Sequence, residues 1–455
     1  MPDEFCHSAL LTDLYELTMA AAYFDSGMRP TATFELFVRR LPEHRSYLLA
    51  AGLEQALHYL ENLRFTAEEI AFLRAQPVFR HVSSEFFDFL ARFRFTADVW
   101  AVPEGTPVFP QEPLMRVTGP IIDAQIVETY LLAALSFPSL IATKASRIVE
   151  AAQGRAVVEF GTRRAHGPEA GILAARAAYV GGCVGTSNVE AGVRFGIPTM
   201  GTLAHSFVMA FEDELEAFRQ MERIYPEHSI LLIDTYDSIE AVDAIITAGL
   251  RPRGVRIDSG DMGALSKEVR AHLDRGGLRE TTIFASGDLN EHSIAALIAS
   301  GAPINAFGVG TELATSKDAP ALSSVYKLVE VVHGHEHSYR LKLSRGKKTY
   351  PGAKQVYRYS LDGVYHHDLV ACQGERYPEA EPLLQCVMRD GRRVAPPPSL
   401  PNVQLYAREC LARLPERFRR LKAADTYPVE VSGELQRLEE QERRKHTHPE
   451  GVRRG

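Results

Sequence analysis

The 455-residue sequence predicts an α/β protein in which a (β/α) barrel is inserted into a second, α+β domain formed from both chain ends. Three observations predict this class. Short apolar runs rich in β-branched residues alternate with helical patterns between residues 126 and 325, which favours a parallel sheet with helical crossovers. The two flanking segments lack this alternation. Polar and glycine residues follow the apolar runs, as at the ligand-binding edge of barrels and open parallel sheets.

The central region contains seven strand-like runs, most of them followed by a helical pattern. The runs are 157–160, 183–185, 198–202, 230–233, 254–257, 281–285 and 306–309. The helical patterns are 168–179, 189–195, a long stretch after 202 through 222, 239–248, 264–273 and 294–299. Seven or eight such units favour a barrel, although periodicity alone also fits an open doubly wound sheet.

The flanks, 1–125 and 326–430, are expected to be the two parts of the α+β domain. Their predicted strands are 33–38, 98–101, 328–332, 339–343, 355–360 and 383–388, and their predicted helices include 53–63 and 67–73. The histidine-rich segment His333–His337 joins two strand-like runs and contains Gly334, so a hairpin turn is favoured over a metal cluster. Residues 431–455 are typical of a solvated, charged helix with a frayed tail.

Composition restricts the classes of partner and compartment. Lys plus Arg number 51 and Asp plus Glu 58, a net charge of −7, so we expect no general binding to nucleic acid. The five cysteines include no CxxC pair, which argues against a disulfide scaffold or a structural zinc site and favours a reducing cytoplasm. The polar, acidic start argues against a signal peptide, and without a run of 18 uncharged apolar residues we expect no membrane span.

Two clusters near the start of the central region could bind an anion. FGTRRAHG places Arg163 and Arg164 beside glycines, where a pair of arginines can hold an anion, stack on a flat ring or simply be solvated. GTSNVEAG places Ser187 and Asn188 at an expected helix start, which favours a phosphate or carboxylate, although helix capping explains the same residues.

Three later turns point to a sugar phosphate. RIDSGD brings carboxylates next to a glycine turn, which suits a sugar diol or Mg²⁺, and SGD recurs one unit later. FGVGT then offers backbone N–H groups that could hold a terminal phosphate. The residues concerned are Arg256, Asp258, Asp261, Ser286, Gly287, Asp288, Gly308, Gly310 and Thr311.

A single histidine completes the set. In GTLAHSF, His205 follows a strand-like run, and the acidic residues of 212–216 come next, one of which could orient the imidazole. A lone histidine is more often structural. The sequence has no GxxxxGK[ST], HExxH or GxSxG motif, and GVGTEL lacks the third glycine of a dinucleotide fingerprint.

Taken in order, these motifs resemble nicotinate phosphoribosyltransferases. The matching segments are LLTDLYELTMAAAYF, EFGTRRAHG, GTSNVEAGVRFGIPTMGTLAHSF, RIDSGD, FGVGTELATS and KKTYPGAKQVYR, and they run from about Leu10 to about Arg389. The resemblance implies a type II phosphoribosyltransferase fold, with an irregular α/β barrel, an α+β domain and a dimer that shares its active sites. It also implies an ATP-coupled, C–N bond-forming ligase of NAD salvage, which converts nicotinate and 5-phosphoribosyl-1-pyrophosphate to nicotinate mononucleotide and pyrophosphate.

The resemblance also implies roles for individual residues. His205 would accept a phosphoryl group from ATP and become a transient phosphohistidine, while Asp258 and Asp261 would contact the ribose hydroxyls or Mg²⁺. The residues expected around nicotinate are Tyr15 from the partner subunit, Phe160, Arg163, Ser187, Thr202 and Arg256. The residues expected around the 5-phosphate are Gly287, Asp288, Gly308, Gly310 and Thr311, with Lys144 and Arg147 as candidates for pyrophosphate.

Other functions stay open at this point. Nicotinamide phosphoribosyltransferases share the fold but carry an Asp in the turn that aligns with GTSNV, where this chain has Ser187. A quinolinate phosphoribosyltransferase would need a basic pocket for two carboxylates and is a shorter chain. A catalytically silent nucleotide-binding barrel is disfavoured by the retained set of Arg163, His205, Asp258, Asp261 and Asp288. LLIDTYDS lacks the adjacent acidic pair and the TTG of type I phosphoribosyltransferases.

Overall fold

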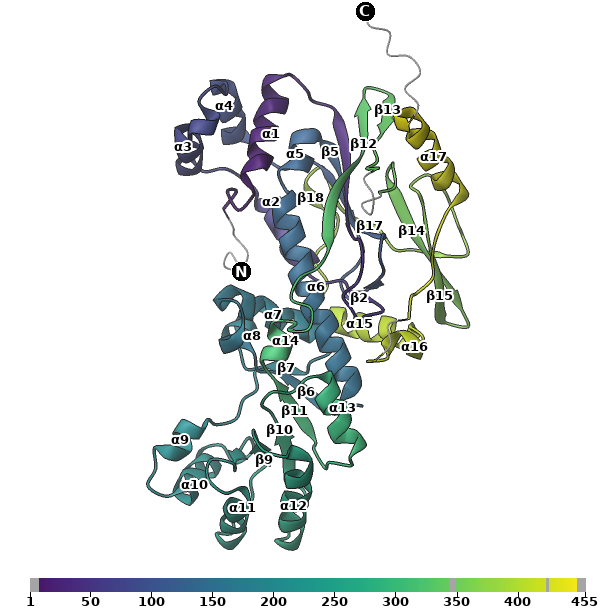
Figure 1. Cartoon of the computed structure of the whole chain (residues 1–455). Coiled ribbons are helices and arrows are strands. Elements are labelled where there is room, and N and C mark those ends of the chain that lie inside the picture. The colour runs from purple at the N-terminus through teal and green to yellow at the C-terminus, as the bar shows by residue number, and fades with distance from the viewer. Residues whose placement is uncertain (1–7, 344–348, 423–424, 448–455) are drawn as a thin grey trace, which may run out of the picture. The chain divides into compact units, whose positions relative to one another are not determined.

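The structure, a computed structural model, describes residues 8–343, 349–422 and 425–447, which form two compact units (Figure 1). The terminal unit comprises Met1–Ser139 and Ala321–Gly455, and the central unit comprises Leu140–Pro320. The central unit therefore lies within the predicted 126–325 range. The polar start 1–7, the first two lysines of KKTYPGAKQVYR and the tail from 448 lie outside the described residues.

The terminal unit is built on antiparallel strands from both chain ends. Its seven-stranded sheet has the order β13 (Glu336–Tyr339), β12 (Ser324–His333), β1 (Thr31–Val38), β5 (Pro113–Pro120), β3 (Asp98–Ala101), β17 (Gln385–Arg389) and β18 (Arg392–Arg393). A second sheet has the order β16 (Glu381–Pro382), β14 (Lys354–Leu361), β15 (Val364–Cys372) and β19 (Val429–Val431), and β2 (Leu48–Leu49) pairs with β4 (Pro107–Val108).

Strand pairing joins the two ends of the chain. β1 pairs with β12, and β3 pairs with β17, so residues about 290 positions apart in the sequence are hydrogen-bonded neighbours. This confirms the predicted α+β domain made from both ends. The hairpin predicted at His333–His337 is also confirmed, because β12 and β13 pair in antiparallel register across Gly334, whose φ of +61° suits a tight turn. The strand predicted at 339–343 instead ends at Tyr339.

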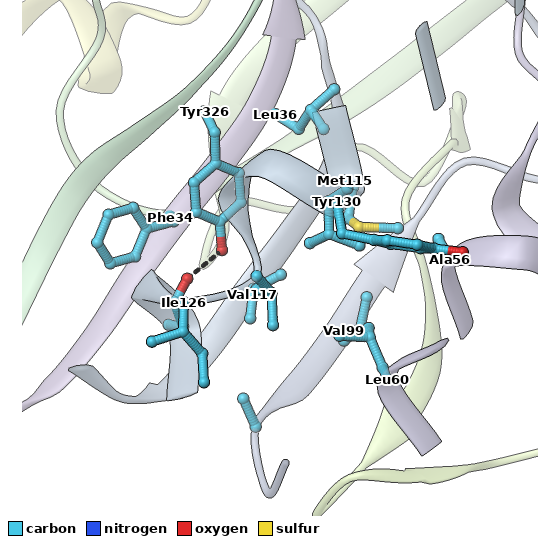
Figure 2. Close-up of a cluster of buried hydrophobic side chains, with 14 of the residues drawn as sticks. Phe34, Leu36, Ala56, Leu60, Val99, Met115, Val117, Ile126, Tyr130 and Tyr326 are labelled. Carbon is cyan, nitrogen blue, oxygen red and sulfur yellow. Dashed lines mark hydrogen bonds between the residues drawn. The ribbon is translucent and has the colours of Figure 1, made fainter. Parts of the chain in front are cut away.

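Helices of the terminal unit help to form its hydrophobic core (Figure 2). The helices are α1 (Leu14–Asp25), α2 (Leu53–Asn62), α3 (Ala67–Ala75), α4 (Ser84–Arg92), α5 (Ile121–Gln125), α15 (Leu400–Arg413), α16 (Glu416–Arg419) and α17 (Gly433–Thr447), with a 3₁₀ turn η1 (Pro77–Phe79). In this core Phe34 of β1 stacks on Tyr326 of β12, with ring centroids 5.0 Å apart, and the Tyr326 hydroxyl donates to the Ala124 carbonyl at 2.7 Å. Aromatic packing thus adds to the pairing of the two ends.

The charged residues of the KQVYR motif are structural. Lys354 is 3% exposed, and its Nζ lies 2.8 Å from the Glu35 carboxylate of β1. Arg358 is 1% exposed, and its Nε donates to Asp368 of β15 at 2.9 Å. Buried charges require such partners because an unpaired ion is costly away from water. This motif therefore contributes to the interior of the terminal unit.

The central unit contains one parallel sheet of six strands. Its order is β7 (Gly185–Thr186), β6 (Ala156–Glu159), β11 (Ala306–Val309), β10 (Thr282–Ala285), β9 (Gly254–Ile257) and β8 (Ile230–Leu232). The seventh predicted strand, 198–202, makes only a single parallel bridge, between Thr199 and Thr186. Pro198 has no N–H to donate, which weakens pairing there. Among the described residues no ladder joins this segment to β8, so the parallel sheet is irregular, as the resemblance implied.

Helices follow the strands of the central unit in the expected order. They are α7 (Pro168–Val180), α8 (Val189–Phe195), α9 (His205–Met209), α10 (Glu214–Ile224), α11 (Ser238–Thr247), α12 (Met262–Arg275), α13 (Glu291–Ala299) and α14 (Thr311–Ala314), with a 3₁₀ turn η2 (Thr162–Arg164). The long helix predicted after residue 202 is wrong, because α9 ends at Met209 and a new helix begins at Glu214. Asp213 causes the break by capping α10, its carboxylate accepting from the Leu215 N–H at 3.2 Å.

One helix, α6 (Glu128–Ala151), begins in the terminal unit and ends in the central unit. The stretch Ile121–Ala151 that contains it is long and apolar enough to cross a membrane by length and composition alone. In the protein 61% of its apolar window is buried, and the helix carries the ion-paired residues Lys144 and Arg147. These are properties of a core helix.

Candidate active site

A cavity of about 670 Å³ lies in the central unit, where the parallel ladder is interrupted. The residues from Thr199 to His205 line it, together with Leu232 at the end of β8. Turns that follow β6, β7 and β9 complete the wall. Seven predicted site residues line this one cavity: Phe160, Arg163, Ser187, Thr202, His205, Arg256 and Asp258.

Arg256 on β9 lines the cavity and forms hydrogen bonds with groups from three neighbouring segments. Its Nε donates to Ser286 Oγ at 2.6 Å, and its Nη1 donates to Thr202 Oγ1 at 2.7 Å and to the Leu203 carbonyl at 3.1 Å. Its Nη2 donates to Asp258 Oδ1 at 2.6 Å. One planar guanidinium therefore connects the ends of β9 and β10 with the 199–205 segment, a geometry that a lysine cannot reproduce.

Asp258 is held as a carboxylate. Burial by itself raises the pKa of Asp258, but hydrogen bonds from Ser286 and Arg256 outweigh burial and hold that pKa below its ordinary value. Its backbone N–H donates to Asp234 Oδ2 at 3.0 Å. The turn is thus fixed by groups from β8, β9 and β10, and the negative charge of Asp258 persists at neutral pH.

His205 is the first residue of α9, and its side chain is 41% exposed. Its Nδ1 lies 3.2 Å from Thr235 Oγ1, and its Nε2 lies 3.9 Å from Asp258 Oδ2. The prediction that the acidic 212–216 run could orient this imidazole is wrong, since Thr235 and Asp258 are its polar neighbours. An accessible imidazole beside a carboxylate can accept and release a proton or a phosphoryl group.

Phe160 provides an aromatic face. Its ring stacks on Phe284 with centroids 5.6 Å apart, and its N–H donates to the Val309 carbonyl at 2.8 Å. A Cβ added at Gly308 would lie 2.6 Å from Phe160 and 2.8 Å from Phe284. Gly308 therefore leaves room for these rings, a packing reason for this glycine beside the predicted phosphate contact.

The turns predicted to hold phosphate follow β10 and β11. Gly287 has a φ of +107°, and a Cβ there would lie 2.5 Å from the Asp258 carbonyl, so only glycine fits this approach. Gly310 precedes α14, and Thr311 is the first residue of that helix. Asp288 and Asp261 are exposed, and Asp261 caps α12 by accepting from the Ala264 N–H at 3.1 Å. These residues flank the 670 Å³ cavity but do not line it.

Two residues that support the site, Glu159 and Asp234, were not predicted from the sequence, and Ser286 was named only as part of the recurring SGD turn. Glu159 is fully buried at the end of β6, where it accepts from the Thr186 hydroxyl at 2.6 Å and from the Gly161 N–H. Burial raises the pKa of Glu159 against these hydrogen bonds. Asp234 supports the Asp258 turn, and Ser286 links Asp258 with Arg256. Each follows or ends an apolar run, the same signal that RIDSGD gives.

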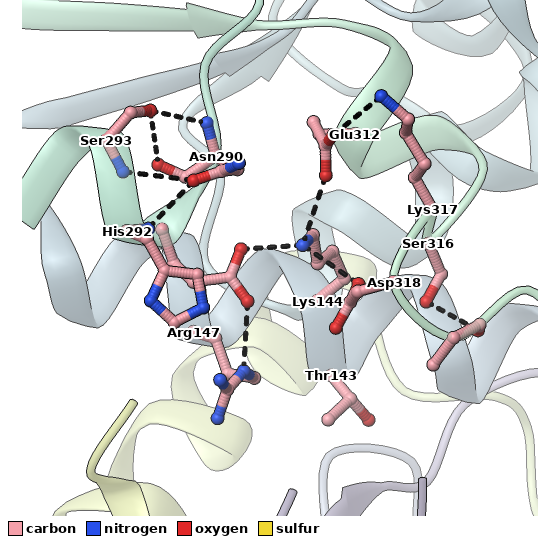
Figure 3. A network of polar contacts seen from close by, with 12 residues as sticks. Thr143, Lys144, Arg147, Asn290, His292, Ser293, Glu312, Ser316, Lys317 and Asp318 are labelled. Carbon is pink, nitrogen blue, oxygen red and sulfur yellow. Dashed lines mark hydrogen bonds and ion pairs between the residues drawn. The ribbon is translucent and has the colours of Figure 1, made fainter. Parts of the chain in front are cut away.

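The structure does not support pyrophosphate contacts for Lys144 and Arg147. Lys144 is 1% exposed, and its Nζ lies 2.6 Å from Glu291 and 2.9 Å from Asp318 (Figure 3). Arg147 is 2% exposed, and its Nε lies 3.2 Å from Glu291. These cations are committed to internal carboxylates and have almost no solvent-accessible surface. Tyr15 lies on α1 in the terminal unit, with 46% of its surface exposed.

Comparison with known proteins identifies the family of this chain. Residues 10–136 and 376–439 match the models of the nicotinate phosphoribosyltransferase N- and C-terminal domains, and 141–322 match the quinolinate phosphoribosyl transferase C-terminal domain. Nicotinate phosphoribosyltransferases of Mycobacterium tuberculosis and Bacillus subtilis are 48% and 37% identical, over 94% and 95% of each chain respectively.

Solved structures give the same result. The crystal structure of human nicotinic acid phosphoribosyltransferase has a TM-score of 0.83 at 30% identity, covering 95% of this chain and 99% of that one. Nicotinate-nucleotide pyrophosphorylase from Pyrococcus furiosus has a TM-score of 0.72 at 27% identity, covering 89% and 95%. These matches confirm the predicted fold class and the predicted resemblance. The chain belongs to the nicotinate phosphoribosyltransferase family.

Proposed function

We propose that this protein joins nicotinate to 5-phosphoribosyl-1-pyrophosphate in NAD salvage. The pyridine nitrogen forms a bond with ribosyl C1 while the bond from C1 to the pyrophosphate oxygen breaks. The products are nicotinate mononucleotide and pyrophosphate, and ATP is hydrolysed to ADP and phosphate in the same cycle. The observation that carries this proposal is the single cavity that gathers an aromatic face, cations, a histidine and a carboxylate in a chain of this family.

The cavity suits a flat anionic ring. Phe160 offers a face for stacking, and Ser187 offers a hydroxyl where an Asp would repel the nicotinate carboxylate. Arg256 uses all three of its nitrogens on protein acceptors. Arg163 is exposed at the cavity wall, so we assign attraction of the carboxylate to Arg163 and positioning of the surrounding turns to Arg256.

Asp258 and His205 would carry the charge-dependent steps. A fixed carboxylate stabilises the positive charge that develops on the ribosyl ring as pyrophosphate leaves. His205 Nε2 would attack the γ-phosphorus of ATP, releasing ADP, and water would later take the phosphoryl group as inorganic phosphate. Asp258 Oδ2 lies 3.9 Å from this nitrogen. Transient phosphorylation of His205 thereby couples ATP to synthesis.

Magnesium is proposed only as a partner of substrate phosphates. The described residues contain no group of three or more His, Cys, Asp or Glu that could hold a metal ion by themselves. Mg²⁺ typically uses one or two carboxylates together with substrate phosphates and water. Asp258 Oδ2 and the exposed Asp261 fit that role, and the ion would neutralise the leaving pyrophosphate when it is bound.

A homodimer in the cytoplasm completes the proposal. In the terminal unit Leu11, Leu14 and Tyr15 are 51%, 55% and 46% exposed. In the central unit Val189 and Val193 on α8 are 69% and 77% exposed, and Val189 lines the cavity. Clustered apolar side chains at a surface mark interaction sites. We therefore assign Tyr15 of one subunit to the active site of the other, which a fully active monomer in light scattering would contradict.

The decisive experiment compares nicotinate, nicotinamide and quinolinate as substrates. Each is incubated with the full-length protein, 5-phosphoribosyl-1-pyrophosphate, Mg²⁺ and ATP, and the nucleotide, ADP and pyrophosphate are quantified. Conversion of nicotinate with matched formation of ADP is the expected result. Conversion of nicotinamide alone would overturn the choice of substrate, and absence of turnover with all three would overturn the enzymatic function.

A further inference from the structure

A cluster of charged side chains surrounds Lys144 of α6, beside the segments that follow the two turns predicted to hold the 5-phosphate (Figure 3). Lys144 Nζ lies 2.6 Å from Glu291, 2.9 Å from Asp318 and 3.5 Å from Glu312. Arg147, one helical turn later on α6, contacts Glu291 from the other side. Lys317 contacts Glu312 at 3.1 Å, so three cations face three carboxylates.

The carboxylates come from the segments that follow the two turns. Glu291 is the first residue of α13, three positions after Asp288. Glu312 is the second residue of α14, directly after Thr311 and two positions after Gly310. Two turns from neighbouring strands β10 and β11 are therefore tied to one ammonium group, through the helices that they start.

The central ion pair of the cluster, between Lys144 and Glu291, is buried. Lys144 and Glu291 are 1% and 0% exposed, so water does not compete for their contact. Burial raises the pKa of Glu291, but the charge of Lys144 outweighs burial and keeps the pKa below its ordinary value. Removing one partner from a buried pair leaves an uncompensated charge, which strongly destabilises the arrangement that the pair holds together.

We propose that Lys144 is a positioning residue for the phosphoribosyl substrate, because it sets the spacing between the turn at Gly287–Asp288 and the turn at Gly310–Thr311. This inference rests on the proposed function. It predicts that Lys144 controls the affinity for 5-phosphoribosyl-1-pyrophosphate without touching that substrate. The ion pairs of Lys144 reach Glu291, Glu312 and Asp318, whereas Phe160 and Ser187 on the nicotinate side of the cavity follow β6 and β7.

The test uses Lys144→Met, which keeps the length of the side chain but removes its charge. Steady-state kinetics are measured well below the melting temperature of each variant. We expect the KM for 5-phosphoribosyl-1-pyrophosphate to rise at least about tenfold, while the KM for nicotinate stays within about twofold. Lys317→Met is the matched control, since Lys317 is 64% exposed and contacts the same Glu312 from the solvent side. It should leave both KM values unchanged.

Two further measurements keep the inference testable. If Lys144→Met does not fold, Glu312→Gln takes its place, because it weakens the 3.5 Å contact between Lys144 and Glu312, the longest of the three. This variant should show the same rise in the KM for 5-phosphoribosyl-1-pyrophosphate without a matching rise for nicotinate. If the wild-type protein turns over none of the pyridines, calorimetric binding of ribose 5-phosphate replaces kinetics, and Lys144→Met or Glu312→Gln should weaken it about tenfold. Equal changes in both KM values, or unchanged binding of the phosphate, would overturn the positioning role whether or not the proposed function holds.

Discussion

Replacing Arg256 by lysine tests whether the site depends on a planar guanidinium or only on a positive charge. Arg256 is 9% exposed and makes four hydrogen bonds to four different acceptors. A lysine ammonium can keep a contact with Asp258, but it cannot reach Ser286 and Thr202 in the same geometry. The variant thus keeps the charge while it removes the connection between β9, β10 and the 199–205 segment.

The magnitude follows from the bonds that are lost. A hydrogen bond to a charged group contributes about 1.5–3 kcal/mol, so losing two of them costs about 3 kcal/mol or more. If the whole loss appears in the reaction, kcat/KM falls roughly 150-fold, since about 1.4 kcal/mol corresponds to a factor of ten. Any share that appears in folding lowers Tm instead, by about 2–4 °C per kcal/mol for a domain of this size. The prediction concerns the sum of the two effects.

The assay measures kcat/KM for nicotinate mononucleotide formation together with Tm by differential scanning calorimetry. Arg253→Lys is the matched control, because Arg253 is exposed and lies just before the same strand. We expect Arg253→Lys to change neither quantity. Wild-type kcat/KM within threefold and an unchanged Tm for Arg256→Lys would refute the reasoning that the guanidinium geometry organises the cavity.

Three more predictions address separate groups. In the wild type we expect kcat/KM for nicotinate to exceed that for nicotinamide at least about tenfold. Ser187→Asp should lower this ratio, because the new carboxylate repels the carboxylate of nicotinate. An unchanged ratio would place Ser187 outside the substrate pocket. His205→Ala should abolish stimulation by ATP while slower ATP-independent synthesis persists, and undiminished stimulation would exclude the phosphohistidine. Burial raises the pKa of Glu16 from 4.5 to about 7. Between these pH values the folded state keeps a proton that the unfolded chain has lost, so the free energy of unfolding decreases as the pH rises from about 4.5 to about 7. Glu16→Gln should flatten the decrease in Tm over this range, and an unchanged slope would contradict the assignment.

Local sequence determined much of the candidate site. Each strand of the central unit is a short buried run, and the polar residues that follow it must emerge at the same edge because parallel strands share one direction. The order of strands and turns along the chain therefore predicts that Phe160, Ser187 and Asp258 lie close together, and all three line one cavity. Helix caps are equally local, since Asn188 and Asp261 bond to N–H groups only three residues away.

Other features depended on packing. The resemblance to nicotinate phosphoribosyltransferases implied that Lys144 and Arg147 bind pyrophosphate. Only the tertiary structure brings Glu291, Glu312 and Asp318, nearly 150 residues or more away, around Lys144. A charge binds whichever opposite charge the folded chain places beside it in a dry environment, and that choice is not encoded by neighbours in the sequence.

The central unit shows both what local sequence determines and what tertiary packing determines. The sequence by itself determined the α/β class, the family and seven of the fourteen residues that line the cavity, because these follow from periodicity and from motifs of a few residues. The tertiary structure decided that 198–202 makes one bridge instead of a strand, and that Arg256 donates hydrogen bonds to four protein acceptors. Hydrogen bonds between distant segments depend on how the backbone is packed, and a residue's neighbours in the sequence carry no record of that packing.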